Sequence, residues 1–162
     1  MTGVRMERVI AAAASVIAFG LAAIVLFLFI STNAWPAEGA GTIKTLTGSA
    51  TVNRGSSVLP IATAQHVFAG DRIVSGQDSY VGITLHDDTR LTIGPGSELL
   101  IREFEFNPNS HAGGLVVSFV TGTARVVTGL IGKNAPERVR FQTPTATIGI
   151  RGTEFIVDLE TE

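Results

Sequence analysis

An apolar run near the N-terminus constrains this chain more than any other feature. Residues 9–30 are apolar at 20 of 22 positions, interrupted only by Ser15 and Gly20. A helix of that length spans roughly 33 Å at about 1.5 Å per residue, enough to cross a hydrocarbon core of about 30 Å. The apolar part of a secretory signal peptide is shorter, roughly 7–15 residues. We therefore predict one N-terminal transmembrane helix that is retained as an anchor.

The charges that flank this run predict its orientation. Arg5 and Arg8 precede it, and no basic residue follows until Lys44. The positive-inside rule then places the N-terminus in the cytoplasm and the remainder on the other side of the membrane, in a single pass. The alternative is cleavage of the leader after the small residue Ala34. On either reading, the rest of the chain is exported.

Four segments follow from this division. We expect a short cytoplasmic tail at residues 1–8, the anchor (or signal) at 9–30, a linker at 31–40 and an all-β domain at 41–162. The chain contains no cysteine, which excludes disulfides and thiolate metal sites. With 12 Lys and Arg against 14 Asp and Glu, the net charge of -2 argues against a nucleic-acid partner.

Period-two alternation of apolar residues predicts the all-β domain. The runs 80–85 and 90–93 alternate strictly, and residues 86–89 between them predict a hairpin turn with an aspartate as local hydrogen-bond acceptor. About ten to twelve short strands are expected, in a β-sandwich, barrel or β-roll. We expect Thr84, Thr92 and Thr147 to face outward, and the following residues to pack inward: Val81, Ile83, Leu85, Leu91, Ile93, Ile148, Ile150 and Phe155.

A weak internal echo links residues 48–52, 122–126 and 144–148. Each has a turn residue, a hydroxyl residue, Ala, a polar residue and a β-branched residue. The small Ala predicts that two layers approach closely there. In the last segment, Ala146 is expected to share an apolar face with Ile148 and Ile150.

The sequence contains little that indicates chemistry. His66, His86 and His111 fall in separate turns, where we expect solvated side chains; a metal site would need their approach in the tertiary fold. Asp87 and Asp88 are adjacent on a turn, so we expect them to point apart and to be solvated. No phosphate-binding loop or activated nucleophile is recognisable. We therefore expect no catalytic residue, no metal and no cofactor, and the chain is not expected to be an enzyme.

Four segments of the chain resemble the FecR domain family: GDRIVSG at 70–76, SYVGITL at 79–85, DTRLTIGPGS at 88–97 and FQTPTATIGIRGTEF at 141–155. The resemblance covers residues 41–159. The hairpin tip departs from the family, which usually has Asp-Gly-Thr where this chain has Asp-Asp-Thr, so the turn type there could differ. The residues that carry the family motif, in a structural or an interaction role, are Gly70, Asp71, Asp88, Thr143, Pro144, Arg151, Gly152 and Thr153.

The resemblance implies a periplasmic all-β module of stacked short strands, which residues 9–30 would anchor in the inner membrane with a single pass. Its best-known members link an outer-membrane receptor to a cytoplasmic sigma factor. They carry a cytoplasmic sigma-binding domain and a further receptor-contacting region, whereas here eight residues precede the apolar run and the sequence stops at Glu162. We therefore do not expect the full signalling role to transfer.

Three functional readings follow. The first is a membrane-tethered binding module that recognises an envelope protein or polymer. The second is a component of sigma/anti-sigma signalling, linked indirectly to a sigma factor or an outer-membrane receptor, whose cytoplasmic part is supplied by another chain or lost by truncation. The third, an enzyme or metal-dependent hydrolase, is the least favoured. Within the motif, we expect Arg151 to pair with a carboxylate at a structural corner, the rival being a surface contact with an anionic partner.

Overall fold

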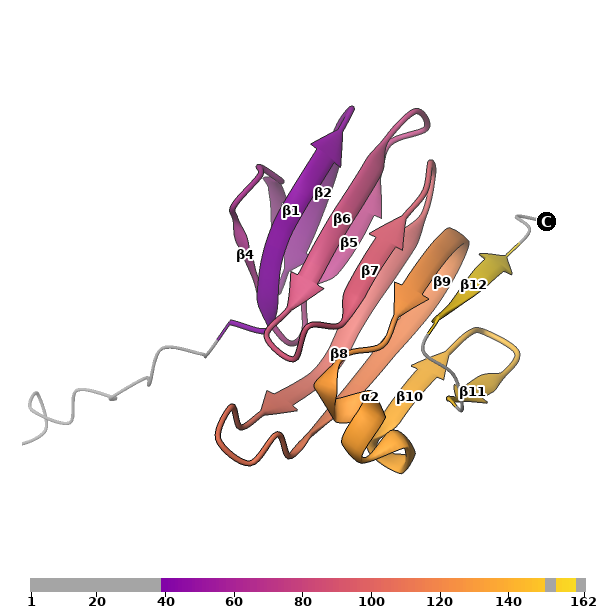
Figure 1. Ribbon diagram of the computed structural model, residues 1–162. Coiled ribbons are helices and arrows are strands. Elements are labelled where there is room, and N and C mark those ends of the chain that lie inside the picture. The colour runs from indigo at the N-terminus through magenta and orange to yellow at the C-terminus, as the bar shows by residue number, and fades with distance from the viewer. Residues whose placement is uncertain (1–38, 151–153, 160–162) are drawn as a thin grey trace, which may run out of the picture. The chain divides into compact units, whose positions relative to one another are not determined.

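The computed structural model describes residues 39–150 and 154–159, all within the compact unit Ala37–Glu162. This part is built mostly of strands, which confirms the all-β prediction (Figure 1). The predicted transmembrane helix lies outside the described residues; within them, no helix is long and apolar enough to cross a membrane. The strands are β1 (Gly41–Thr47), β2 (Ala50–Arg54), β3 (Ser57–Pro60), β4 (His66–Val67), β5 (Arg72–Ser75), β6 (Tyr80–Leu85), β7 (Arg90–Ile93), β8 (Glu98–Phe106), β9 (Gly113–Val127), β10 (Val139–Gln142), β11 (Thr147–Gly149) and β12 (Glu154–Leu159). The described helical segments are the short α2 (Leu130–Asn134) and the 3₁₀ helix η1 (Pro136–Arg138).

The 15-residue strand β9 joins two layers of one curled sheet. Its first half pairs antiparallel with β8 and parallel with β10, and its second half pairs antiparallel with β7 and β12. One layer therefore has the order β4-β1-β6-β7-β9-β12, and the other has the order β3-β2-β5-β8-β9-β10-β11. Figure 1 shows β2 and β5 behind β1 and β6. The apolar faces of the two layers enclose a single core.

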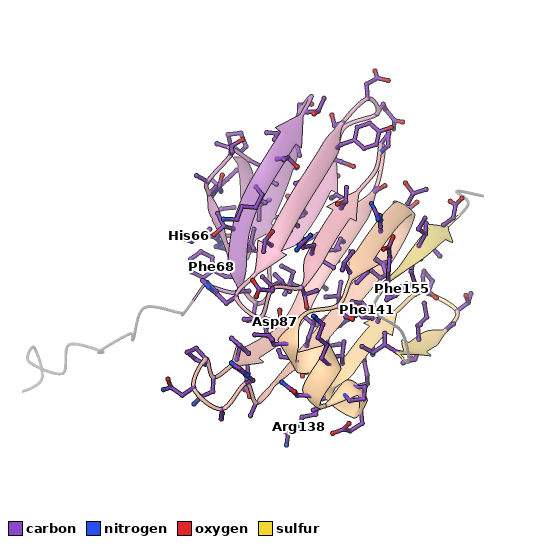
Figure 2. The ribbon with its side chains drawn as sticks, viewed as in Figure 1. His66, Phe68, Asp87, Arg138, Phe141 and Phe155 are labelled. Atoms are coloured by element: carbon purple, nitrogen blue, oxygen red, sulfur yellow. The ribbon has the colours of Figure 1, made fainter. Side chains whose placement is uncertain are left out.

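The alternation predicts the faces of the central strands correctly. Five of the expected core residues, Val81, Ile83, Leu85, Leu91 and Ile93, are at most 2% exposed, while Thr92 and Thr147 are exposed and Thr84 is half-buried. Ile150 is buried, and Ile148 and Phe155 pack partly buried against the core. Phe155 meets the ring of Phe141 edge to face, 4.9 Å between centroids (Figure 2).

Two of the three echo segments form equivalent corners at which the chain passes from one layer to the other. Gly48 and Gly122 have φ values of 76° and 78°, in the left-handed region. The residue after each glycine donates its N–H to a serine hydroxyl, at 2.8 Å to Ser79 and at 2.9 Å to Ser97. The echo therefore records a repeated corner.

The alanines of the echo behave differently from one another. Ala50 and Ala124 are 7% and 6% exposed, as the predicted close approach of two layers requires. Ala146 is exposed, because it lies in the turn between β10 and β11 and no second layer covers it. The expected apolar face shared by Ala146, Ile148 and Ile150 is thus wrong at Ala146.

A second repeat, with a spacing of 18 residues, becomes visible once the strands are placed. Residues 72–83 and 90–101 share Arg, an aliphatic residue, Gly, Ser and Ile at equivalent positions. Each segment runs from one layer to the other through a Gly-x-x-Ser turn, between β5 and β6 or between β7 and β8. The glycines Gly76 and Gly94 donate their N–H groups to the carbonyls of Ser49 and Thr123, at 2.8 and 2.9 Å. Each turn is therefore bonded to one of the two corners.

The two repeats together relate the layers by an approximate two-fold symmetry. The central order β1-β6-β7-β9 in one layer corresponds, read backwards, to β2-β5-β8-β9 in the other. Strands β1 and β2 thus correspond to the two halves of β9. The N-terminal strands consequently belong to the same core, to which they contribute Ile43, Val52 and Val67.

Candidate functional site

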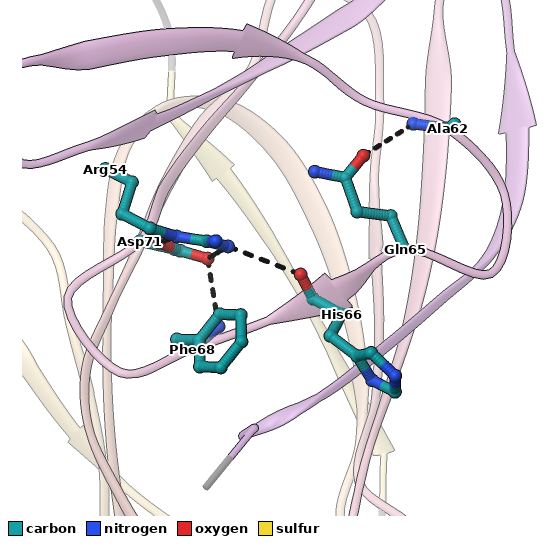
Figure 3. Close-up of polar contacts among 6 residues, drawn as sticks. All are labelled: Arg54, Ala62, Gln65, His66, Phe68 and Asp71. Atoms are coloured by element: carbon teal, nitrogen blue, oxygen red, sulfur yellow. Dashed lines mark hydrogen bonds and ion pairs between the residues drawn. The ribbon is translucent and has the colours of Figure 1, made fainter. Parts of the chain in front are cut away.

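The Gly70-Asp71 motif lies in the loop that leads into β5 (Figure 3). Asp71 is fully buried, and its carboxylate accepts hydrogen bonds from Nε and Nη2 of Arg54, both at 2.7 Å, and from the Phe68 N–H at 2.9 Å. The Arg54 guanidinium also lies 4.2 Å from the centre of the Phe68 ring and donates to the His66 carbonyl at 3.3 Å. Asp71 thereby ties β2 to the β4–β5 loop.

The contact with Asp71 stabilises the charged form of Arg54. The hydrogen bond to Asp71, reinforced by the charge of that carboxylate, raises the pKa of Arg54 above its ordinary value, against the opposing effect of burial. Nothing in the sequence around Arg54 indicated the pair, because its partner lies 17 residues away in a loop. Gly70 has φ 90°, and a Cβ there would have no atom within 4 Å, so its backbone conformation alone favours glycine.

The hairpin between β6 and β7 corrects the expectation for Asp87. Asp87 is fully buried, whereas Asp88 is exposed as expected, with φ 66°. The Asp87 carboxylate accepts from the N–H and hydroxyl of Thr89, at 3.1 and 2.7 Å, and from the Ile131 N–H at 3.4 Å. The carbonyl of Asp87 accepts from the Leu130 N–H at 2.6 Å. Asp87 is buried because α2 packs on this turn, a contact that the local sequence could not indicate.

The remaining motif residues form the turn between β10 and β11. The Thr143 N–H donates to the Ala146 carbonyl at 2.8 Å, and the Ala146 N–H donates to the Thr143 hydroxyl at 3.0 Å. Pro144 is exposed at the tip of that turn. Arg151, Gly152 and Thr153 lie outside the described residues, so the proposed Arg151 corner stays a prediction.

The described motif residues occupy three separate turns. Asp71 bonds to β2, and Thr143 bonds within its own turn. At the β6–β7 turn, Asp88 is exposed and donates its N–H to the Leu85 carbonyl, while its neighbour Asp87 bonds to Ile131 in α2. The structure therefore does not gather the described motif residues into one cleft.

The histidines have exposed side chains, as expected. Two of them, however, flank the same residue: a Cβ on Gly39 would lie 3.7 Å from His86 Nε2 and 3.9 Å from His66 Cβ. His111 instead stacks on Phe106, with 6.3 Å between ring centres. Among residues 39–150 and 154–159, no three His, Asp or Glu side chains are grouped so that they could hold a metal ion.

A groove of about 620 Å³ opens beside His86. It lies where the β6–β7 turn, the hairpin between β8 and β9 and the end of η1 meet. The residues that line it are Gly39, His86, Phe104, Glu105, Phe106, Asn107, Pro108, Ala112, Gly113 and Arg138. Figure 2 labels Arg138 at the end of η1 and Asp87 on the neighbouring turn.

Large apolar side chains are exposed on two edge strands. On β3, Val58 is 66% and Leu59 is 42% exposed; on β12, Ile156 is 71% exposed. Both strands lie at the end of a layer, where a further strand could pair. Tyr80, 53% exposed, lies at the start of β6.

The fold and these contacts define a two-layered all-β module whose motif residues stabilise turns. A family model described as FecR protein matches residues 71–162, more than half of the sequence. The chain belongs to the FecR family. No curated protein and no solved structure matches it. The match begins at Asp71, whereas the two layers already begin with β1.

Proposed function

We propose that the chain is an exported, membrane-tethered FecR-family module that acts by binding an envelope protein or polymer, without catalysing a reaction. The observation that carries the proposal is the contrast between its buried and exposed groups. The buried carboxylates of Asp71 and Asp87 are bonded to the module itself, whereas Val58, Tyr80 and Ile156 are more than half exposed. Val58 and Ile156 lie on edge strands, whose unpaired main-chain groups can pair with a strand of another protein.

Export and tethering are supported by the 22-residue apolar run and the arginines before it. The test is an alkaline phosphatase fusion after Glu162, combined with carbonate washing of membranes. The expected result is an active fusion that stays in the membrane pellet. An inactive fusion would overturn export, and a soluble species beginning at Trp35 would replace the anchor with a cleaved signal.

Binding is tested with the full chain as bait in cells treated with a chemical crosslinker. The expected result is a reproducible adduct with one envelope component. As the control, isolated membranes that contain the bait are heated to unfold it and are then crosslinked, and the adduct should be absent. Recovery of the same species with the unfolded bait would mean that the contact does not depend on the folded module.

Membership of the FecR family supports a second candidate, a role in sigma/anti-sigma signalling. A neighbouring gene pair for a sigma factor and an outer-membrane receptor would favour it. Deletion of this chain should then change transcription of the receptor gene. Unchanged transcription, together with a crosslinked envelope partner, would favour the first proposal.

A further inference from the structure

The groove beside His86 has the size and composition of a binding site. Its volume of about 620 Å³ lies within the range of roughly 300–1,000 Å³ that is usual for ligand sites. Four segments distant in sequence build it: the residues before β1, the β6–β7 turn, the β8–β9 hairpin and η1.

The apolar part of the groove is formed by two phenylalanines. Phe104 and Phe106 are half-buried and packed against the core, so their positions are held from below. Phe106 is further held by the parallel ring of His111, at an interplanar angle of 5°. Gly113 also lines the groove, and it presents main chain only. A Cβ at this position would come within 2.1 Å of the Glu105 carbonyl oxygen, so a larger residue does not fit there. This surface suits an aromatic or large aliphatic side chain.

The polar part of the groove is formed by Arg138, with His86. Arg138 is exposed, and among the described residues no carboxylate lies within ion-pair distance of it, as is also the case for Arg90 and Arg140. Its guanidinium therefore has donors available for an external carboxylate. Arg138 is the one Arg or Lys among the residues that line the groove, so a single carboxylate matches it better than a polyanion.

We propose that this groove binds a peptide segment of a partner protein in which one carboxylate side chain lies beside an aromatic or large aliphatic side chain. The apolar side chain rests on Phe104 and Phe106, and the carboxylate accepts hydrogen bonds from Arg138. This inference rests on the proposed function and names the chemistry of the partner.

The test is ligand-observed NMR by saturation transfer, with the full chain in lipid nanodiscs and empty nanodiscs as blank. The probe is the capped peptide Gly-Ser-Asp-Phe-Gly-Ser. The comparison peptides replace Asp by Lys or Phe by Ser. The expected result is transfer to the Phe ring protons of the first peptide, at least fivefold weaker for the other two. Absence of transfer to the Asp-Phe peptide, or equal transfer to the Lys-Phe peptide, would overturn the proposal.

The protein variants are Arg138→Glu and, as a matched charge reversal on the exposed face of β7, Arg90→Glu. Arg138→Glu should lose the Asp-Phe peptide and gain the Lys-Phe peptide, and Arg90→Glu should behave as the wild type. If Arg138→Glu has a lowered melting temperature, Arg138→Gln is used in its place. This variant should lose binding of the Asp-Phe peptide without gaining binding of the Lys-Phe peptide. An unchanged signal in a folded Arg138 variant overturns the groove assignment, while a crosslinked partner elsewhere on the module would still support the proposed function.

Discussion

The buried carboxylate of Asp71 explains why the Gly-Asp motif is bound to a residue far from it in sequence. A fully buried charge is costly unless a partner compensates it, and Arg54 provides a bidentate one. The part of the motif that sequence reasoning could predict was the turn. The partner could not be predicted, because nothing in the sequence near Asp71 indicates which strand provides the arginine that contacts it.

Removal of Arg54 should therefore destabilise the module through Asp71. We expect Arg54→Ala to lower the free energy of unfolding by about 2–4 kcal/mol, because it leaves a buried carboxylate with only the Phe68 N–H. Arg54→Lys should cost less, since it keeps the charge but not the fork. Urea denaturation followed by circular dichroism measures both.

The control is the exposed pair of Arg125 and Glu154, whose side chains are 58% and 48% exposed. Arg125→Ala should cost less than about 1 kcal/mol, because water screens the pair. Equal losses for Arg54→Ala and Arg125→Ala would contradict the role given to the buried carboxylate.

The repeated corner gives a second prediction at the residue scale. A Cβ on Gly122 would lie 2.3 Å from Ser97 Oγ and 2.7 Å from Ser97 Cα, in a backbone conformation with positive φ. We expect Gly122→Ala to lower the free energy of unfolding by roughly 2–5 kcal/mol, from backbone strain and overpacking together. Gly55 also has positive φ but open space around it, so Gly55→Ala should cost only about 1–2 kcal/mol. A Gly122 variant no less stable than the Gly55 variant would show that the corner is not tightly packed.

At the scale of elements, the alternation predicted the inner and outer faces of β6 and β7 because both strands are central and covered on one side. We expect Ile83→Ala to lower the free energy of unfolding by about 2–5 kcal/mol, since Ile83 is 1% exposed. Thr92→Ala, on the exposed face of β7, should change it by less than about 0.5 kcal/mol. Chemical denaturation of both variants checks the assignment, and similar losses would mean that the faces are reversed.

The burial of two turn residues, Asp87 and Ala146, differs from the sequence-based prediction because it depends on segments distant in sequence. Asp87 was expected in solvent because an isolated hairpin tip is solvated; in the fold, the first residues of α2 cover it. Ala146 was expected inside because it follows the same local scheme as Ala50 and Ala124. Ala146 lies in the turn before β11, an edge strand of a hairpin, so the same local scheme has no second layer against which to pack there.

At the scale of the molecule, the two-fold arrangement predicts that the family match at 71–162 is not an independent folding unit. Without residues 37–70, β6 and β5 lose β1 and β2 as neighbours, and Ile73 and Ile83 become accessible to water. We expect residues 37–162 to unfold cooperatively in urea and residues 71–162 to show no cooperative transition. A cooperative transition of similar midpoint in the shorter chain would place the N-terminal strands outside the core.

The claim that the chain acts by binding from the envelope is tested most directly by site-specific photocrosslinking of the full chain in living cells. A benzophenone amino acid is placed in turn at Val58, Tyr80, Phe106 and Ile156, positions on the two exposed strand edges, the start of β6 and the groove. We expect a light-dependent adduct with one discrete envelope component at one or more of these positions, and none without light. The absence of an adduct at all four positions, with the chain folded and present in the membrane fraction, would contradict it.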